Sequence, residues 1–474
     1  LEPFVGPAKT AEDVEDARSA LESFYHKQGY VTVLVNIPEQ TVESGTVRLE
    51  IIESKIRRVR ITGNRYFTME KIQKALPSFK EGEILHLPVL QEELAAVNRN
   101  PDIKVAPLLT PGKELGTIDV ELKVKDKLPL HGSLELNNRS SHDTTNLRLN
   151  AIIRYDNLWQ KEHSASFQFQ TSPEDTDEVK AFAGSYVLPA LWGKDQMLAV
   201  YGLYSDSEVA TGEGFQTLGK GQIYGVRNII PLPSIDTYTH SLSLGLDYKD
   251  FDDDLSFLTG EPAVTTPATY MPLSASYNSS LAHHSGVTSF SAGLNVAFRG
   301  LVTDMEEFQD KRFESRGNYL YATLAVERNQ PLPRNLNLYA KLDGQIADQP
   351  LISNEQYFAG GLRNVRGYKE VEEAGDNAFH ATLELSYSTD GSRFNLGDWW
   401  RVSPYVFFDY AYLRLKDSLP GEDSTNTLMG AGVGVRGYLT KYFEYELAWG
   451  RALEDTTRTD SGEDRFYFVT KGQF

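Results

Sequence analysis

The chain has 474 residues, of which 40% are hydrophobic, and its formal net charge is -19. This length is too great for one ordinary domain, and the negative charge excludes binding to the phosphate backbone of nucleic acid. The absence of cysteine excludes disulfide bonds and thiolate metal sites. No run of about 18 apolar residues is present, which excludes a transmembrane helix but leaves open membrane-spanning β-strands of about 9–11 residues. The first residues lack the pattern of a signal peptide, which is expected to be removed or absent.

The first part of the chain reads as short helices and strands. A helix begins at Thr10, which can form a capping box with Asp13, and it ends before Gly29. Strand-like runs follow at 31–37 and 47–52. We interpret this unit as an incomplete copy of the next one, with its opening strand and helix missing from this chain.

A second unit follows with a complete set of elements. The patterns predict a strand at 56–62, helices at 68–76 and 88–97, and strands at 103–109 and 117–125. The order is therefore β-α-α-β-β, and the last three elements match what remains of the first unit.

After about residue 128 the helical period disappears and a period of two continues to residue 474. Segments 240–249, 288–299 and 335–346 each place apolar side chains on one face and polar side chains on the other. These runs are longer than strands of soluble sheets, and their polar faces carry Asn, Lys, Asp and Gln. A soluble β-sandwich is the alternative interpretation.

The connectors between these runs decide between the two. Short connectors such as 281–285 and 330–334 alternate with long polar ones such as 251–267 and 301–315. This asymmetry is typical of an outer-membrane barrel, and counting the runs gives about sixteen strands, an even number as such barrels need.

The longest connector, 348–377, contains the stretch GGLRNVRGYKE at 360–370. Its glycines permit backbone conformations that other residues avoid, and they surround a single arginine, Arg366. The connector also carries apolar residues, which would be unexpected in a loop exposed to solvent. We therefore expect it to fold into the lumen of the barrel, where the arginine needs a carboxylate partner.

The predicted partner is Asp409, in the run YVFFDYAYL at 405–413. Phe407 and Asp409 share one face of this strand, whereas Val406 and Phe408 form a face suited to lipid. Gly430, Gly432 and Gly434 also share one face, and if that face is lumenal they would leave room for the inserted loop.

These two segments resemble the signature of the two-partner secretion transporters, the TpsB branch of the POTRA-containing outer-membrane superfamily. The V-R-G-[FY] tip and the F-x-D-x-G strand motif of that family fall on Val365, Arg366, Gly367, Tyr368, Phe407, Asp409 and Ala411, with alanine in place of the final glycine. The β-α-α-β-β units are similar to its periplasmic POTRA domains. The resemblance covers essentially the whole chain.

The resemblance implies a fold of α+β periplasmic POTRA domains followed by a 16-stranded antiparallel transmembrane β-barrel. The expected domains are POTRA 1 at 1–54, POTRA 2 at 55–127 and the barrel at 128–474. The expected location is the Gram-negative outer membrane, with the POTRA domains in the periplasm. The barrel would be a monomer in contact with outer-membrane lipid, inserted by the barrel-assembly machinery.

The implied function is type V secretion without catalysis or cofactors. An unfolded exoprotein, such as a haemolysin or an adhesin, would bring its N-terminal secretion domain to the POTRA units. Docking by strand addition to the edge at 103–109 is plausible, which makes Ile103 and Val105 candidate docking residues. The Arg366–Asp409 pair would hold the loop in the lumen while the exoprotein passes.

Two other functions remain open, an insertase that assembles other outer-membrane barrels and a passive porin. An insertase would share the arginine loop but usually carries more POTRA units. A porin needs neither the POTRA units nor the loop. The run GVGVRG at 432–437 matches a dinucleotide-binding fingerprint, but no helix follows it, so no enzymatic role is assigned, and no metal site is expected.

Overall fold

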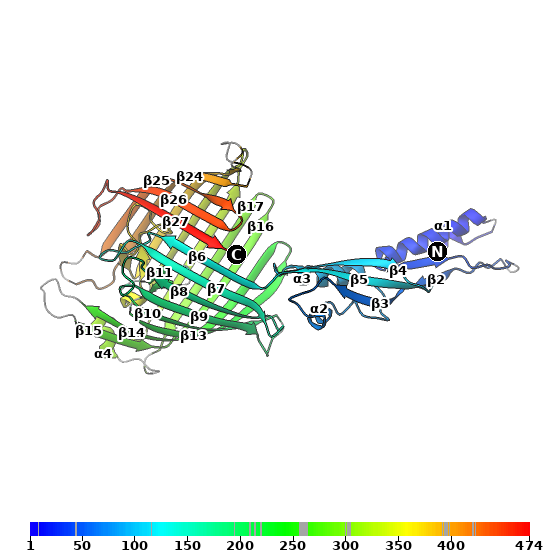
Figure 1. The fold of residues 1–474 in the computed structure, drawn as a ribbon, viewed down its shortest axis with the longest axis horizontal. Helices are drawn as coiled ribbons and strands as arrows, with labels where there is room; N and C mark the ends of the chain where they lie inside the picture. The colour runs from blue at the N-terminus through cyan, green and yellow to red at the C-terminus, as the bar shows by residue number, and fades with distance from the viewer. Residues whose placement is uncertain are drawn as a thin grey trace. The chain divides into compact units, whose positions relative to one another are not determined.

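The computed structural model divides into two compact units, residues 1–129 with 159–161, and residues 130–158 with 162–474 (Figure 1). Each unit is described by itself. Among the described residues, no helix is both long and apolar enough to cross a membrane. The structure describes the whole chain except residues 8, 43–44, 115, 194, 208–209, 213–214, 219, 256–263, 299, 301–304, 391, 393–396, 398, 420 and 422.

The first unit begins with a helix packed on a two-stranded sheet. Helix α1 (Ala11–Lys27) starts with a capping box, in which Thr10 accepts from the backbone of Asp13 and Asp13 accepts from the backbone of Thr10. Both predicted bonds are therefore present. A short 3-10 helix, η1 (Glu2–Phe4), precedes α1, and the sheet pairs β1 (Val33–Asn36) with β2 (Glu50–Glu53).

The remainder of this unit has the predicted β-α-α-β-β order. A three-stranded sheet has the order β3-β5-β4, with β3 parallel and β4 antiparallel to the central strand β5. Apolar side chains from the sheet and both helices form one core, because the hydrophobic effect favours their removal from water. The elements are β3 (Lys55–Thr62), α2 (Met69–Ala75), α3 (Leu87–Asn98), β4 (Ile103–Pro111) and β5 (Thr117–Asp126).

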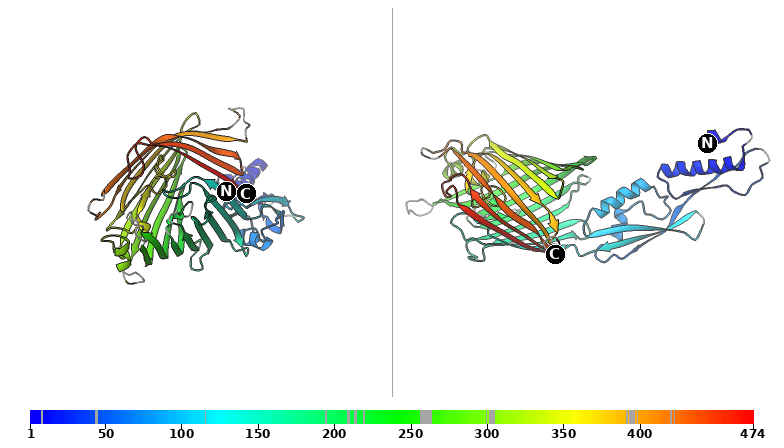
Figure 2. Two further views of the ribbon diagram at one scale, coloured as in Figure 1. Left: turned by 60° about the vertical axis from the view of Figure 1, so that its left-hand side comes forward. Right: turned by 90° about the horizontal axis from the view of Figure 1, so that it is seen from above.

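The second unit is a closed antiparallel barrel (Figures 1 and 2). Its described residues form eighteen strand segments, of which β15 continues into β16 and β22 into β23, so that sixteen strands close the ring. The predicted fold class is confirmed.

The barrel segments are β6 (Leu130–Asn137), β7 (Arg148–Leu158), β8 (His163–Thr171), β9 (Lys180–Pro189), β10 (Met197–Asp206), β13 (Gly221–Ile235), β14 (Tyr238–Leu255), β15 (Val264–Tyr270), β16 (Pro272–His283), β17 (Gly286–Ala297), β18 (Leu320–Pro331), β19 (Leu336–Ala347), β22 (Asn377–Tyr387), β23 (Thr389–Asp390), β24 (Arg401–Arg414), β25 (Thr425–Thr440), β26 (Phe443–Ala452) and β27 (Asp464–Gln473). A separate hairpin pairs β11 (Ala210–Gly212) with β12 (Phe215–Leu218).

The barrel strands expose apolar side chains outward and turn polar ones inward. On β24, Val406 is 52% exposed and Phe408 44%, whereas Phe407 and Asp409 are buried. The alternation follows from the period of two along a strand, and the outer face suits lipid.

The connector between β19 and β22 folds into the barrel as a small hairpin. It contains a 3-10 helix, η2 (Ser353–Glu355), and the paired strands β20 (Tyr357–Ala359) and β21 (Glu373–Gly375). Helix α4 (Met305–Lys311), from the preceding connector, packs Phe308 into a buried cluster with Tyr270 and with Leu351 at the start of the inserted loop.

Candidate functional site

The tip of the inserted loop depends on glycines. Gly360, Gly361 and Gly367 have φ values of 111°, 94° and 114°, which other residues rarely adopt. On the barrel wall, a Cβ at Gly430 would lie 1.8 Å from the backbone oxygen of Arg366. Glycine there allows the tip to lie directly against strand β25.

Arg366 lies inside the barrel and binds Asp409 in a two-pronged ion pair. Its Nε donates to Oδ2 at 2.7 Å and its Nη2 donates to Oδ1 at 2.8 Å, while its backbone N–H also donates to Oδ2 at 3.1 Å. The side chain of Arg366 is 6% exposed and that of Asp409 is fully buried. A fork–fork pair of this kind fixes the orientation of the arginine as well as its position.

Two further side chains complete the surroundings of the guanidinium. Its Nη1 donates to Glu384 Oε2 at 3.0 Å, and its Cζ lies 3.6 Å from the centre of the Phe407 ring. The sequence interpretation missed Glu384, although it stands in phase with the lumenal side chain of His380 on β22, and an acidic residue on a lumenal face was the available signal. Glu384 also pairs with Arg436 of β25.

The other tip residues are buried against the last strands. Val365 and Tyr368 are fully buried, and Val365 packs in a cluster with Ala411. The Tyr368 hydroxyl lies 3.0 Å from the carbonyl oxygen of Met429 and 2.8 Å from that of Glu454. Alanine at position 411 is thus accommodated by direct packing.

Ion pairs with buried carboxylates also hold the two ends of the loop, and sequence reasoning missed them. Arg312, just after α4, donates to both oxygens of Asp376 at 2.5 and 2.8 Å, and Asp376 is fully buried. At the other end, Lys249 Nζ lies 2.5 Å from Glu355 Oε1. These partners are far apart in sequence, so no local pattern joined them.

A cavity of about 1350 Å³ lies at the end of the barrel that carries the short turns. Its lining is rich in polar and charged side chains, including Arg363, Arg436 and Glu446. Arg363 Nη1 pairs with Glu446 Oε2 at 2.7 Å, so the charges below the tip form a connected series.

The predicted docking residues lie on the edge strand β4 of the N-terminal unit. The side chains of Ile103 and Val105 are buried in the core. The outward-facing backbone of Val105 is occupied, because its N–H donates to Asn98 Oδ1 at 2.7 Å and its carbonyl accepts from Asn98 Nδ2 at 3.0 Å. At Val105 the edge of the sheet is therefore covered by the side chain of Asn98.

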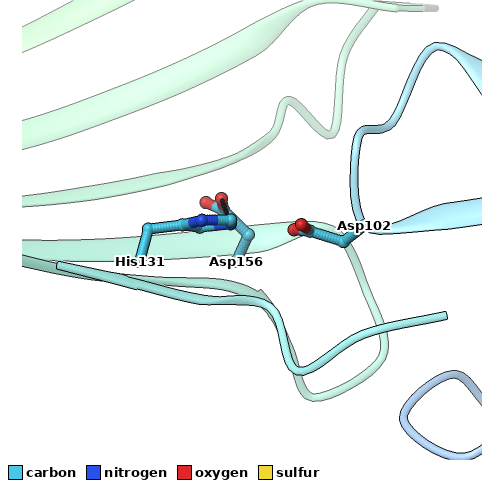
Figure 3. Close-up of side chains that lie close together, drawn as sticks. All are labelled: Asp102, His131 and Asp156. Carbon is cyan, nitrogen blue, oxygen red and sulfur yellow. Dashed lines mark ion pairs between the residues drawn. The ribbon is translucent and has the colours of Figure 1, made fainter. Parts of the chain in front are cut away.

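Charged side chains also gather at the start of the first barrel hairpin (Figure 3). His131 Nε2 on β6 lies 3.5 Å from Asp156 Oδ2 on β7, and Arg154 Nε lies 3.1 Å from the same oxygen. Asp102, also drawn in Figure 3, belongs to the N-terminal unit, where it pairs with Lys127. We assign no binding role to the His131–Asp156 pair.

Comparison with known proteins agrees with this geometry. Residues 116–437 match the family described as haemolysin secretion/activation protein ShlB/FhaC/HecB, and residues 1–54 match the POTRA domain of ShlB type. The chain is 25% identical over 407 residues to the outer membrane transporter CdiB of Dickeya dadantii, covering 81% of this chain and 68% of that protein.

Two solved structures share the fold. One is CdiB from Escherichia coli, with a TM-score of 0.68, 19% identity and coverage of 100% of this chain and 86% of that one. The other is BamA from Haemophilus ducreyi lacking POTRA domains 1–3, with a TM-score of 0.63, 15% identity and coverage of 99% and 95%. These likenesses concern the fold alone.

The fold and the inserted arginine loop define a POTRA-bearing outer-membrane barrel. The family match covers more than half of the chain, and the chain belongs to the haemolysin secretion/activation family ShlB/FhaC/HecB, the transporters of two-partner secretion. It is an outer-membrane protein with its POTRA region in the periplasm. Strand β6 follows the periplasmic POTRA region in the chain and so begins at the periplasmic side of the membrane. The short turns therefore face the periplasm, and the long connectors face the cell surface.

Proposed function

We propose that the barrel carries an unfolded exoprotein from the periplasm to the cell surface and that the arginine loop controls its passage. The observation that carries this proposal is the buried attachment of Arg366 to Asp409 and Glu384 in a family of secretion transporters. The side chains that hold the tip come from the barrel wall, so a change at these contacts can shift the loop between discrete positions.

The proposed domains are POTRA 1 at 1–54, POTRA 2 at 55–127 and the barrel at 128–474. In support, α1, β1 and β2 follow the same order as α3, β4 and β5, and residues 1–54 match the POTRA model. Each module ends in an antiparallel strand pair.

Docking of the exoprotein by strand addition to β4 requires a local rearrangement. The Asn98 side chain makes both backbone hydrogen bonds that a residue of an added strand would make to Val105. Pro107, in phase with Val105, provides no N–H to a partner. An added strand would therefore displace Asn98 and pair with outward-facing groups of Ile103 and Leu109.

The export role is tested by producing the chain together with a candidate TpsA-like exoprotein and measuring how much of that exoprotein is secreted. Arg366→Ala and Asp409→Ala are expected to reduce secretion by about tenfold or more, because each removes a charge-assisted, two-pronged contact. Barrel assembly, followed by heat-modifiable migration in electrophoresis, is expected to persist. Arg458→Ala is the matched control, since this arginine is half exposed on a surface connector. Undiminished export by both variants would contradict the proposed role of the tip.

An insertase that assembles other outer-membrane barrels is the alternative function, because it would share the barrel and the inserted arginine loop. Deleting the gene would then lower the amounts of many outer-membrane barrels. A two-partner transporter is expected to affect only its exoprotein, so profiling the outer-membrane proteins of the deletion strain distinguishes the two.

A further inference from the structure

The seam between the last and first barrel strands is incomplete at the cell-surface end. Strand β27 pairs with β6 only from Val469↔Asn137 to Gln473↔Ser133, whereas its other edge pairs with β26 as far as Arg451↔Asp464. Among the described residues, none in a strand therefore lies opposite the outer part of β27 on the β6 side. In the part of the chain that the structure describes, the backbone and side chain of Asn138 extend the pairing, with bonds to Phe466 and Phe468.

The inserted loop lies behind this incomplete part of the seam. The backbone N–H of Gly367 donates to the hydroxyl of Tyr467 at 2.8 Å, and that hydroxyl donates to the carbonyl oxygen of Tyr368 at 2.6 Å. Tyr467 belongs to β27 and is buried. The loop is thus attached to the last strand directly next to its arginine tip.

The loop also binds the connector that follows the first strand. Arg139 donates to both oxygens of Glu370, at 2.8 and 3.4 Å, and the backbone N–H of Glu370 donates to the carbonyl oxygen of Ser140 at 3.1 Å. The side chains of Arg139 and Glu370 are 12% and 9% exposed, so this pair is shielded from solvent.

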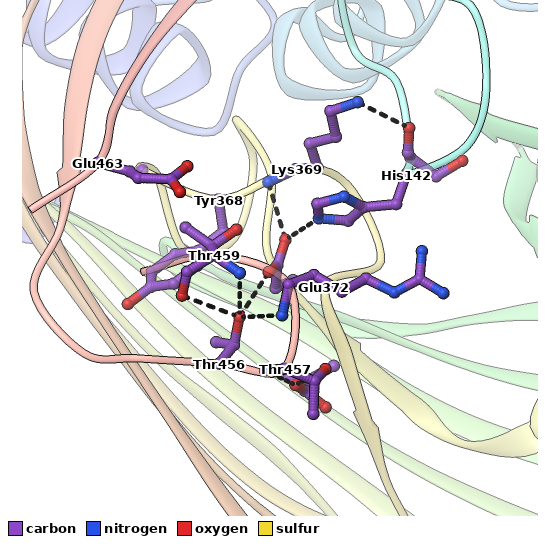
Figure 4. A network of polar contacts seen from close by, with 12 residues as sticks. His142, Tyr368, Lys369, Glu372, Thr456, Thr457, Thr459 and Glu463 are labelled. Atoms are coloured by element: carbon purple, nitrogen blue, oxygen red, sulfur yellow. Dashed lines mark hydrogen bonds and ion pairs between the residues drawn. The ribbon is translucent and has the colours of Figure 1, made fainter. Parts of the chain in front are cut away.

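One carboxylate joins both sides of the seam (Figure 4). Oε2 of Glu372 lies 2.6 Å from Nε2 of His142, in the connector after β6, and Oε1 accepts from the hydroxyl of Thr456 at 2.7 Å, in the connector before β27. The side chain of Glu372 is fully buried. Removing it would leave partners on both sides without their shared acceptor, which is costly in a buried site.

We propose that Glu372, supported by Glu370, makes the inserted loop a clasp that holds the first and last strands of the barrel together. Arg366 and Glu372 are only six residues apart on one short hairpin. Withdrawal of the loop from the lumen and parting of the outer seam are therefore coupled. Glu370 and Glu372 act as positioning residues, and the clasp operates in the empty barrel, independently of the proposed export.

The experiment measures the width of the seam in the full chain reconstituted in lipid nanodiscs without exoprotein. The chain has no cysteine, so Ile153→Cys on β7 and Leu447→Cys on β26 give two unique spin-label sites. Both side chains are half exposed on the outer face and neither contributes to the seam itself. Pulsed electron–electron double resonance then measures the distance between the two spin labels, across β26, β27, β6 and β7.

In the labelled parent we expect one narrow distance distribution. Glu370→Ala/Glu372→Ala is expected to increase the population at longer distances by about tenfold, as for the loss of charge-assisted hydrogen bonds. Asp143→Ala is the matched control: Asp143 pairs with Arg458 across the same two connectors, but both side chains are exposed, so the distribution stays unchanged. An unchanged distribution in the double glutamate variant would overturn the proposal.

A second measurement applies if the Glu370→Ala/Glu372→Ala variant fails to assemble into a barrel. Leu136 and Thr470 are partners in the seam, so Leu136→Cys/Thr470→Cys can close it with a disulfide. If the clasp acts by holding the seam, this cross-link restores the yield of heat-modifiable barrel in the Glu370→Ala/Glu372→Ala background. If the yield stays low with the cross-link formed, the two glutamates serve another structural purpose and the proposal fails.

Discussion

The N-terminal unit and the barrel place their apolar and charged side chains in opposite ways. In the N-terminal unit, Leu76 and Leu85 are fully buried, and its charged side chains lie mostly at the surface. In the barrel, Leu447 is half exposed on the outer face, whereas Asp376 and Asp409 are fully buried. Apolar burial therefore holds the first unit together, and paired charges organise the inside of the second.

The largest expected effect tests the paired charges at the base of the inserted loop. Asp376→Asn leaves the partly buried Arg312 without its ion partner and weakens bonds from the backbone N–H groups of Leu351 and Lys416. We expect a loss of about 3–5 kcal/mol. The measurement is the midpoint temperature of heat-modifiable migration. Asp143→Asn, on an exposed connector, serves as control, and an equal shift in both variants would contradict the assigned importance of burial.

The next effect tests the apolar core of the N-terminal unit. Leu85→Ala removes a fully buried side chain, and we expect a loss of about 2–4 kcal/mol in the stability of this unit alone. Protease cleavage of the N-terminal unit of the full chain at increasing urea concentrations measures it. Val89→Ala, at a partly exposed position of α3, should change cleavage little, and barrel migration should stay the same. A loss of stability in the barrel alone would contradict the conclusion that apolar burial at Leu85 stabilises the N-terminal unit.

A smaller effect is expected at the arginine tip, because Arg366 retains Glu384 when Asp409 is replaced. Asp409→Ala should lower barrel stability by about 2–3 kcal/mol. The double variant Arg366→Ala/Asp409→Ala should lose less than the sum of the single variants, since no arginine is then left without its main partner. Heat-modifiable migration of the four proteins measures this coupling, and strict additivity would show that the pair contributes no specific interaction.

The smallest expected effect concerns Asp126, a carboxylate of the N-terminal unit that contrasts with the fully buried carboxylates of the barrel. Partial burial raises the pKa of Asp126, but hydrogen bonds from the backbone N–H groups of Phe67, Arg65 and Tyr66 outweigh it and lower the pKa below its usual value. A lowered folded-state pKa stabilises the unit above the unfolded pKa, near 4, and this stabilisation is lost as the pH falls through the folded value.

Asp126→Asn should therefore cost about 1 kcal/mol at neutral pH. It should also flatten the loss of stability between about pH 4 and pH 2, the range below the usual carboxyl pKa. Protease cleavage of the N-terminal unit across this range measures both effects. An unchanged pH dependence in the variant would assign the acid sensitivity to other carboxylates.

Much of the fold could be predicted because it depends on local periodicity. The change from mixed helical patterns to a period of two predicts both units, and the capping box at Thr10 predicts the start of α1. The strand edge was harder to predict. Asn98 closes the edge at Val105 from the end of the preceding helix, and its side chain imitates backbone bonds, which no sequence pattern reports.

By itself, the sequence determined the alternating strands, the glycine-rich tip and the lumenal phase of Asp409, because these depend on neighbours in the chain and on a period of two. Only the tertiary structure decided which distant charges meet. Glu384, Arg312 and Glu372 find their partners through closure of the ring and insertion of the loop. The physical reason is that strand stagger and barrel closure set which side chains face each other across the lumen, and these quantities belong to the whole sheet.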